Sequence, residues 1–322
     1  MAAVRIAVVG PTATGKSDLA LDLAQALGAR DQGRAEVINA DASQLYRGMD
    51  IGTAKLPVDQ RRGVPHHQFD VLEVRQEANV ASYQRHARAD AAAIEARGAR
   101  VIIVGGSGLY VRALTDDMDF PGTDPAVRAR LEERARTEGG RALGQELAQQ
   151  DPVAAGRIAP GDTRRIVRAL EVIEITGRPF SASLPDYRDA APTVHLALRV
   201  DRQVLNTRID ARAAAMFDSG LLEETEDLVA LGLREGSTAP RAIGYAQALE
   251  VLAGRMSAQE AVEQTAQATR SLASRQIKWF RRDPRVQWID AALTRQGDWA
   301  DGERQRVLEA ALERIGSAEL VP

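Results

Sequence analysis

The chain has 322 residues, with 42 Lys+Arg against 45 Asp+Glu and a formal net charge of −3. It contains no cysteine, which excludes a disulfide scaffold, a cysteine-ligated zinc site, an iron–sulfur cluster and a thiol nucleophile. The hydrophobic fraction of 44% is ordinary for a soluble globular protein, and the near-neutral charge gives no sign of a nucleic-acid partner. Any basic surface must therefore be local.

The chain opens on a short apolar run, residues 4–9, that contains one arginine and ends at once in Gly-Pro. This length and ending are typical of a buried parallel strand. The run is too short for a transmembrane helix and has no cleavage pattern, so we expect no targeting segment and no membrane partner. Together with the lack of cysteine, this favours a soluble protein of the reducing cytoplasm.

Helix-like and strand-like segments then alternate over the first hundred residues. Leucines recur at every fourth position in 17–27, which predicts a helix, and the Ala-rich segment 80–97 predicts a second one. Short apolar runs at 36–40 and 100–104 predict two more strands. The alternation predicts an α/β fold, in which a parallel sheet carries helices on both faces.

The pattern changes at about residue 118. The sequence predicts helices at 127–136, 143–149 and 163–176 with no strand between them, then a strand at 193–200 and helices at 202–217, 221–231 and 257–282. We therefore expect three parts: a catalytic core formed by 1–117 and 192–290, an all-helical insertion at 118–191, and a tail at 291–322. The tail is charged, and we expect it to form a loosely held helix.

A glycine-rich turn that matches the phosphate-binding pattern G-x-x-x-x-G-K-[ST] follows the first predicted strand. The turn spans Gly10, Pro11, Thr12, Ala13, Thr14, Gly15, Lys16 and Ser17, and a predicted helix comes next. In such a turn the backbone N–H groups and the helix N-terminus attract an anion, the lysine adds a positive charge, and the serine hydroxyl ligates Mg²⁺. These residues are therefore predicted to bind a diphosphate or polyphosphate on a P-loop NTPase-like sheet, with Mg²⁺ held through Ser17.

The acid expected near such a loop does not follow the neighbouring hydrophobic strand. In nucleotide hydrolases and kinases an acid that helps to hold Mg²⁺ ends a neighbouring hydrophobic strand. Here 101–104 is followed by Gly-Gly-Ser-Gly, whereas Asp41 follows the second predicted strand, where it would face the loop across the top of the sheet. Two readings of Asp41 stay open: a functional carboxylate, or the N-cap of a helix that begins near Ser43.

Several blocks of the sequence resemble the bacterial tRNA dimethylallyltransferases. Besides the P-loop, these are Asp-Ala-Ser-Gln-Leu-Tyr-Arg-Gly-Met-Asp-Ile-Gly-Thr at 41–53, Gly-Val-Pro-His-His at 63–67, Val-Gly-Gly-Ser-Gly-Leu-Tyr at 104–110, and further matches at 162–172, 241–245 and 269–281. The blocks keep their order from residue 10 to about 282. A P-loop alone is unspecific, but the 41–53 block together with Gly-Gly-Ser-Gly-Leu-Tyr is highly specific.

The resemblance implies transfer of a dimethylallyl group from dimethylallyl diphosphate to N6 of the adenosine immediately 3′ of the anticodon in tRNA, with release of diphosphate. The P-loop would then hold an isoprenoid diphosphate in place of a nucleotide, which accounts for the missing acid. Lys16, the loop amides and Mg²⁺ would stabilise the leaving group, and Asp41 is the candidate base for the N6 proton.

Further roles follow from the same resemblance. Ser107 would contact the bound substrate, Gln44 would recognise the target base, and Arg241 would lie near the diphosphate, so that Asp41, Lys16, Ser107 and Arg241 form the expected catalytic set. Arg241 could instead be a surface charge at the start of a helix. Besides Asp41, Gln44 and Ser107, the expected RNA contacts near the strand ends are Ala42, where many family members have serine, and Ser43. His66 and His67 are interpreted as packing residues, because adjacent imidazoles point apart.

An enzyme that acts on a base in a structured loop must take that base out of its stack and hold the surrounding RNA. Two basic clusters suit this: Arg128, Arg164, Arg165 and Arg168 on insertion helices, and Arg275, Lys278 and Arg282, which would share one face of the 257–282 helix with Trp279 and Phe280 beside them. The alternative for each is an ordinary solvated helix face.

Three other functions remain open at this point: a P-loop kinase for a small metabolite, an isopentenyltransferase for free adenine nucleotides, and an NTP-dependent RNA-binding switch. The resemblance favours a monomer. The lack of cysteine rules out the zinc finger that eukaryotic relatives append.

Overall fold

The computed structural model describes residues 3–30, 34–118, 120–183, 187–294 and 298–320. The chain divides into two compact units, one formed by Met1–Thr115 with Ala191–Pro322 and the other by Asp116–Ala190. These divisions fall within two residues of the boundaries expected between core and insertion. Each unit is described by itself.

The larger unit is built on one six-stranded sheet. Its strands are β1 (Arg5–Val9), β2 (Ala35–Asn39), β3 (His66–His67), β4 (Arg100–Gly105), β5 (Thr193–Arg199) and β6 (Val286–Asp290). Every pair is parallel, in the order β3-β2-β4-β1-β5-β6, which confirms the predicted parallel sheet. The register sets Val8 of β1 opposite Val104 of β4 and Leu196 of β5. The carboxyl ends of β1, β2 and β4 therefore meet at one edge.

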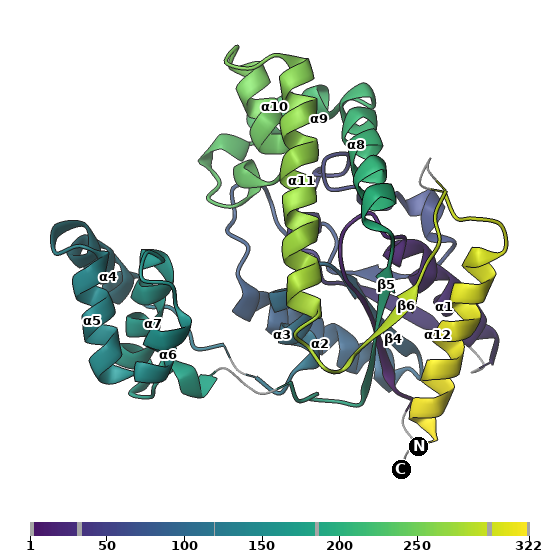
Figure 1. Cartoon of the computed structure of the whole chain (residues 1–322), viewed down its shortest axis with the longest axis horizontal. Coiled ribbons are helices and arrows are strands. Elements are labelled where there is room, and N and C mark those ends of the chain that lie inside the picture. Colours follow the sequence, from purple (N-terminus) through teal and green to yellow (C-terminus); the bar gives the residue numbers. More distant parts are fainter. Residues whose placement is uncertain (1–2, 31–33, 119, 184–186, 295–297, 321–322) are drawn as a thin grey trace. The chain divides into compact units, whose positions relative to one another are not determined.

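Helices cover both faces of the sheet, as predicted. Helices α1 (Lys16–Arg30) and α12 (Glu303–Glu319) lie on one face, and α2 (Val80–Ala96) and α3 (Gly108–Thr115) lie on the other (Figure 1). Ile6 and Val8 belong to the hydrophobic cluster beneath α1 and α12, whereas the intervening Ala7 is buried on the opposite face. A strand covered on both sides needs such a continuous apolar run.

The expectation of a loosely held C-terminal helix is wrong for the described part of that segment. Val307, Ala311 and Ile315 recur at every fourth position of α12 and are at most 1% exposed. They share one hydrophobic cluster with Leu19 and Leu23 of α1. Burial of one apolar stripe is the ordinary way in which an amphipathic helix is stabilised.

A second group of helices extends from the carboxyl edge of the sheet. It comprises α8 (Arg202–Asp218), α9 (Leu221–Ala230), α10 (Tyr245–Leu252) and α11 (Ala258–Phe280), and α8 packs along α11 (Figure 1). The capping box predicted at Ser257 and Glu260 is present at the start of α11. Helix α11 ends at Phe280, so the expectation that Arg282 continues its basic face is wrong, and Arg282 lies in the following turn.

Several short elements were not predicted from the sequence. In the larger unit they are strands β3 and β6, helices α3 and α10, and the 3₁₀ helices η2 (Val58–Arg61), η4 (Leu233–Glu235) and η5 (Ala239–Arg241). The 3₁₀ helix η1 (Ala42–Leu45) begins near Ser43, where one interpretation of Asp41 predicted a helix. Strand β3 has two residues and β6 alternates between buried and exposed positions, so neither forms a continuous apolar run. Within the described residues, no helix combines the length and the apolar character needed to cross a membrane.

The smaller unit is helical throughout its regular structure. It contains α4 (Pro125–Thr137), α5 (Gly140–Gln150), α6 (Pro152–Arg157), α7 (Thr163–Thr176) and the 3₁₀ helix η3 (Phe180–Ser183). Leu131, Leu143, Leu147 and Ile166 are at most 2% exposed and form its core. The Asp162 side chain caps α7, and Gly177 ends that helix with a left-handed φ of 67°.

Candidate active site

The glycine-rich turn leads directly from β1 into α1. Gly10 and Gly15 have φ values of 120° and 92°, which glycine adopts without steric cost. The buried Thr14 donates its hydroxyl to the Pro11 carbonyl at 3.0 Å, and Lys16 Nζ donates to the same carbonyl at 2.7 Å. These bonds hold the lysine against the turn that it is expected to serve.

Helix α8 places two arginines, one turn apart, beside this loop. Arg212 Nη2 donates to the Thr12 hydroxyl at 2.7 Å, and Arg208 Nη1 is buried with no hydrogen-bond partner among the described residues. The pKa of Arg212 is lowered to about 10, mainly by burial and then by the Arg208 charge, while Asp41 opposes the shift. The pKa of Lys16 is lowered to about 8, mainly by burial; Asp41 opposes this shift, and the charges of Arg212 and Arg208 contribute to it. An anion bound beside these cations would favour the charged forms of Lys16 and Arg212.

Asp41 lies just beyond β2 and caps the 3₁₀ helix η1. Its Oδ1 accepts hydrogen bonds from the Ser43 backbone N–H at 3.0 Å and from the Ser43 hydroxyl at 2.7 Å. Asp41 therefore caps η1 through Oδ1, as the second of the two interpretations predicts. No hydrogen-bond partner of Oδ2 is found among the described residues, so this second oxygen stays available, and a catalytic role remains a prediction.

The ends of β2 and β4 are joined by backbone and side-chain hydrogen bonds. Ala40 N donates to the Val104 carbonyl at 2.7 Å, and Ala42 N donates to Ser107 Oγ at 3.2 Å. A Cβ on Gly105 would lie 2.2 Å from the Ala40 carbonyl oxygen, a distance that no side chain tolerates. The Gly-Gly-Ser-Gly block therefore lets the two strand ends close on each other and fixes the Ser107 hydroxyl beside the Asp41 loop.

Gln276 of α11 joins the P-loop to the end of β4. Its Oε1 accepts from the Thr12 backbone N–H at 2.8 Å, and its Nε2 donates to the Gly106 carbonyl at 3.0 Å. A Cβ on Gly106 would lie 2.2 Å from that Nε2. Gln276 is 6% exposed, so these two hydrogen bonds lie in the interior of the site and not at the surface.

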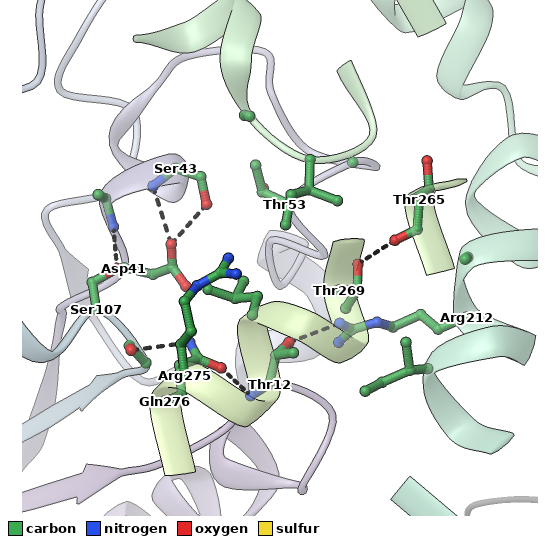
Figure 2. Close-up of a pocket in the computed structure, with 18 of the residues that line it drawn as sticks. Thr12, Asp41, Ser43, Thr53, Ser107, Arg212, Thr265, Thr269, Arg275 and Gln276 are labelled. Carbon is green, nitrogen blue, oxygen red and sulfur yellow. Dashed lines mark hydrogen bonds between the residues drawn. The ribbon is translucent and has the colours of Figure 1, made fainter. Parts of the chain in front are cut away.

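These segments enclose one cavity of about 430 Å³. Figure 2 shows Asp41, Ser43 and Ser107 on one side, Thr269 and Arg212 on the other, and Thr12 and Gln276 between them. Its apolar lining comes from α8, α11 and the segment after η5, and comprises Ile209, Ala213, Met216, Ala242, Ile243 and Leu272. The cavity thus combines a cationic corner, a carboxylate and an apolar wall.

Only some of the predicted site residues line this cavity. Thr12, Asp41, Ala42, Ser43, Ser107, Arg241 and Arg275 line the cavity. Ser17 and Gln44 line a separate cavity of about 30 Å³, and Lys16, Lys278 and Arg282 are not among the lining residues of either. Gln44 Nε2 donates to the Thr53 carbonyl at 3.0 Å, so this side chain contacts the cavity wall from outside.

Two of the four arginines predicted to bind RNA in the smaller unit have internal partners. Arg128 and Arg168 both form ion pairs with Glu171, which is fully buried. Arg168 also donates to the carbonyls of Pro121 and Gly122. These contacts stabilise the start of the unit and give Arg128 and Arg168 a structural role.

Arg164 and Arg165, by contrast, are exposed, and no ion pair engages them among the described residues. They are the second and third residues of α7, which the Asp162 side chain caps. Of the four predicted residues, these two remain free to contact a phosphate backbone.

The residues fit a magnesium ion that arrives with a diphosphate. Ser17 is exposed at the start of α1, directly after Lys16. Among the described residues, no group of three or more histidine, cysteine, aspartate or glutamate side chains could hold a metal by itself. Mg²⁺ is commonly held by one or two protein oxygens together with substrate phosphates and water, and Ser17 would supply the protein oxygen.

Sequence reasoning missed Arg208, Arg212 and Gln276. The two arginines are four residues apart on a helix predicted from the sequence, which is the only local signal they carry. Their function depends on the docking of α8 and α11 onto a loop some 200 residues earlier in the chain, as the Arg212–Thr12 bond shows. Helix periodicity does not encode that contact.

Comparisons with known proteins identify the family of the chain. Residues 44–283 match the family model described as IPP transferase. The chain is 56% identical over 287 residues to the tRNA dimethylallyltransferase of Kineococcus radiotolerans, covering 89% of this chain and 90% of that protein. It is 55% identical over 301 residues to the tRNA dimethylallyltransferase of Mycobacterium tuberculosis, covering 92% and 95%.

Solved structures of tRNA-modifying transferases share the fold of this chain. The full-length tRNA isopentenylpyrophosphate transferase of Bacillus halodurans is 33% identical with a TM-score of 0.68, and the alignment covers 98% of both chains. A eukaryotic dimethylallyltransferase acting on tRNA shares the fold at 24% identity with a TM-score of 0.81, covering 98% of this chain and 80% of that one. The family match at 44–283 spans most of the chain, and the chain therefore belongs to the IPP transferase family.

Proposed function

We propose that this protein transfers a dimethylallyl group from dimethylallyl diphosphate to N6 of the adenosine immediately 3′ of the anticodon in tRNA. The relatives at 55–57% identity are named tRNA dimethylallyltransferases, which supports the reaction class. The observation that carries the proposal is that Thr12 with Arg212 and Asp41 line one cavity that also has an apolar wall. Arg212 matches a diphosphate, the apolar wall matches a short hydrocarbon, and the Asp41 carboxylate matches a base that gives up a proton.

The cationic corner binds the diphosphate. Arg212 reaches the loop through Thr12, and both Arg212 and Arg208 lie close enough to Lys16 to lower its pKa. In the reaction the bond between the allylic carbon and the diphosphate oxygen breaks, and its electron pair leaves with the diphosphate. Fixed positive charges stabilise that developing charge without reorganisation. Mg²⁺ bound through Ser17 and the diphosphate would supply further positive charge.

Asp41 accepts the proton. As N6 of the adenine bonds to the allylic carbon, it becomes acidic, and its proton passes to Oδ2 of Asp41. Oδ1 is held by both donors of Ser43, so the carboxylate has one fixed and one available oxygen. Holding a base in a fixed orientation beside the reacting nitrogen is the usual contribution of general base catalysis.

The apolar wall orients the hydrocarbon. Ile209, Ala213 and Met216 lie on one face of α8, at the spacing of a helical stripe that includes Arg212 at its edge. A dimethylallyl chain whose diphosphate sits at Arg212 therefore lies along an apolar surface, which excludes water from the cation-like carbon. Exclusion of water prevents hydrolysis from competing with transfer.

The test is a transfer assay with purified protein, Mg²⁺ and radiolabelled dimethylallyl diphosphate. The acceptors are tRNA, the same tRNA with guanosine in place of the target adenosine, and AMP. Label in the first alone is the expected result. Label in AMP alone would assign the protein to the free-nucleotide isopentenyltransferases. No label in any acceptor, together with ATP turnover, would overturn the proposal in favour of a nucleotide hydrolase or kinase.

A further inference from the structure

One carboxylate on α9 gathers the backbone donors of a loop that forms part of the cavity wall. Glu224 Oε2 accepts from the N–H of Ile51 at 2.9 Å and of Asp50 at 3.2 Å. Its other oxygen accepts from the Tyr245 hydroxyl and lies 3.5 Å from the Gly52 nitrogen. Hydrogen bonds to an ionised acceptor are about twice as strong as neutral ones.

The loop is seated tightly on this carboxylate. Gly52 N also donates to the Tyr245 hydroxyl at 3.2 Å. A Cβ on Gly52 would lie 2.5 Å from the Tyr245 ring and 2.9 Å from Leu221 Cδ1, so no side chain fits there. Tyr245 is fully buried, and burial raises its pKa, with the Glu224 charge adding to the shift, so its hydroxyl stays protonated and donates to Glu224.

The loop shapes the cavity on the side of Asp41. Gly52 and Thr53 line the cavity together with Asp41, Ala42 and Ser43. The Thr53 carbonyl in turn accepts from Gln44 Nε2, while the Thr53 hydroxyl donates to the Met49 carbonyl at 2.6 Å. Movement of residues 50–53 would therefore change both the wall that faces the base and the orientation of the Gln44 amide.

We propose that Glu224 is a positioning residue, which fixes residues 50–53 and thereby the part of the cavity that receives the acceptor base. Glu224 does not line the cavity and makes no contact with the P-loop in the described structure. Its effect is therefore confined to the acceptor side, and diphosphate binding does not depend on it. This assignment rests on the proposed function.

The experiment compares Glu224→Gln with Glu223→Gln, a matched control on the same helical turn that is exposed. A glutamine at 224 keeps the size but presents an N–H₂ to at least one backbone N–H donor. We expect Glu224→Gln to lower kcat/KM for tRNA at least tenfold, with the dissociation constant of inorganic diphosphate within twofold of wild type. Amide hydrogen exchange at 50–53 should accelerate at least tenfold. Glu223→Gln should behave as wild type in all three measurements.

A second variant, Tyr245→Phe, keeps the buried ring and removes one donor to Glu224. It should shift hydrogen exchange and kcat/KM in the same direction by a smaller factor, which preserves the test if Glu224→Gln does not fold. Unchanged exchange at 50–53 in both variants, or loss of diphosphate affinity equal to the loss of kcat/KM, would overturn the assignment. If the wild type transfers no label to tRNA, the proposed function fails, and the exchange measurement still decides whether Glu224 anchors the loop.

Discussion

Arg212 of α8 donates a hydrogen bond of 2.7 Å to the hydroxyl of Thr12 in the P-loop. This contact joins a helix of the second helical group to the turn after the first strand, and it brings Arg208 to the same corner. A phosphate-binding loop thereby gains two cations from outside its own motif. Burial, and then the neighbouring cations, lower the pKa values of Lys16 and Arg212, so a bound anion would favour the charged forms of both.

Replacement of Arg212 by alanine should weaken diphosphate binding by roughly 10- to 100-fold, the range expected for a hydrogen bond to a charged group. Isothermal titration with inorganic diphosphate measures this directly. Arg234→Ala, which removes an exposed arginine outside the cavity, is the control and should leave the affinity unchanged. Equal affinities for the wild type and Arg212→Ala would remove Arg212 from the diphosphate site.

The affinity for dimethylallyl diphosphate should fall as the pH rises above about 8. Lys16 has a pKa of about 8 in the free protein, and a bound anion favours its charged form, so the pKa is higher in the complex. Below pH 8 the ammonium is charged in both states; above it, binding requires proton uptake, and affinity declines by up to about tenfold per pH unit.

Lys16→Met is the matched variant for this pH measurement. It should bind the substrate more weakly and show a shallower pH dependence between pH 7 and 9.5. A wild-type slope that persists in Lys16→Met would assign the titration to another group.

Gly108→Ala should destabilise the protein by about 1–3 kcal/mol, the range for overpacking a tight contact. A Cβ at this position would lie 2.1 Å from Trp279 Nε1 and 2.3 Å from Trp279 Cδ1, so the indole ring must shift to accommodate it. Urea denaturation measures the loss. The double variant with Trp279→Ala should recover part of it, because the clashing ring is gone; additive losses would show that the Gly108–Trp279 contact is not the cause.

Removal of Arg164 and Arg165 should weaken tRNA binding. The slope of log K against the logarithm of the salt concentration should become shallower by roughly one to two, the change expected when one or two phosphate contacts are lost. Arg168→Ala should instead lower the melting temperature, because Arg168 pairs with buried Glu171 and holds the Pro121 and Gly122 carbonyls. An unchanged salt slope in the Arg164→Ala, Arg165→Ala double variant would exclude this end of α7 from the RNA interface.

The parallel sheet, the P-loop and the position of Asp41 could be predicted because each depends on local sequence. Buried parallel strands are continuous apolar runs, and their carboxyl ends meet at one edge, which brings Asp41 near Lys16. The electrostatic coupling of these two residues follows from that placement. Strands β3 and β6 lack such runs and escaped prediction.

The roles of several arginines could not be predicted because they depend on tertiary contacts. Arg208 and Arg212 have the appearance of an ordinary basic helix face until α8 docks on Thr12. Conversely, Arg128 and Arg168 resemble an RNA-binding face until buried Glu171 engages both. A basic residue in a sequence does not reveal which acid or which anion will meet it.

The most direct test of the account is the single-turnover transfer rate of Asp41→Asn, with dimethylallyl diphosphate and tRNA both saturating. Asparagine retains an oxygen that can cap η1, so the loop should keep its structure. The account predicts a rate roughly 10²- to 10⁴-fold below wild type, the usual contribution of a general base, with tRNA affinity within twofold. A wild-type transfer rate in Asp41→Asn would contradict it.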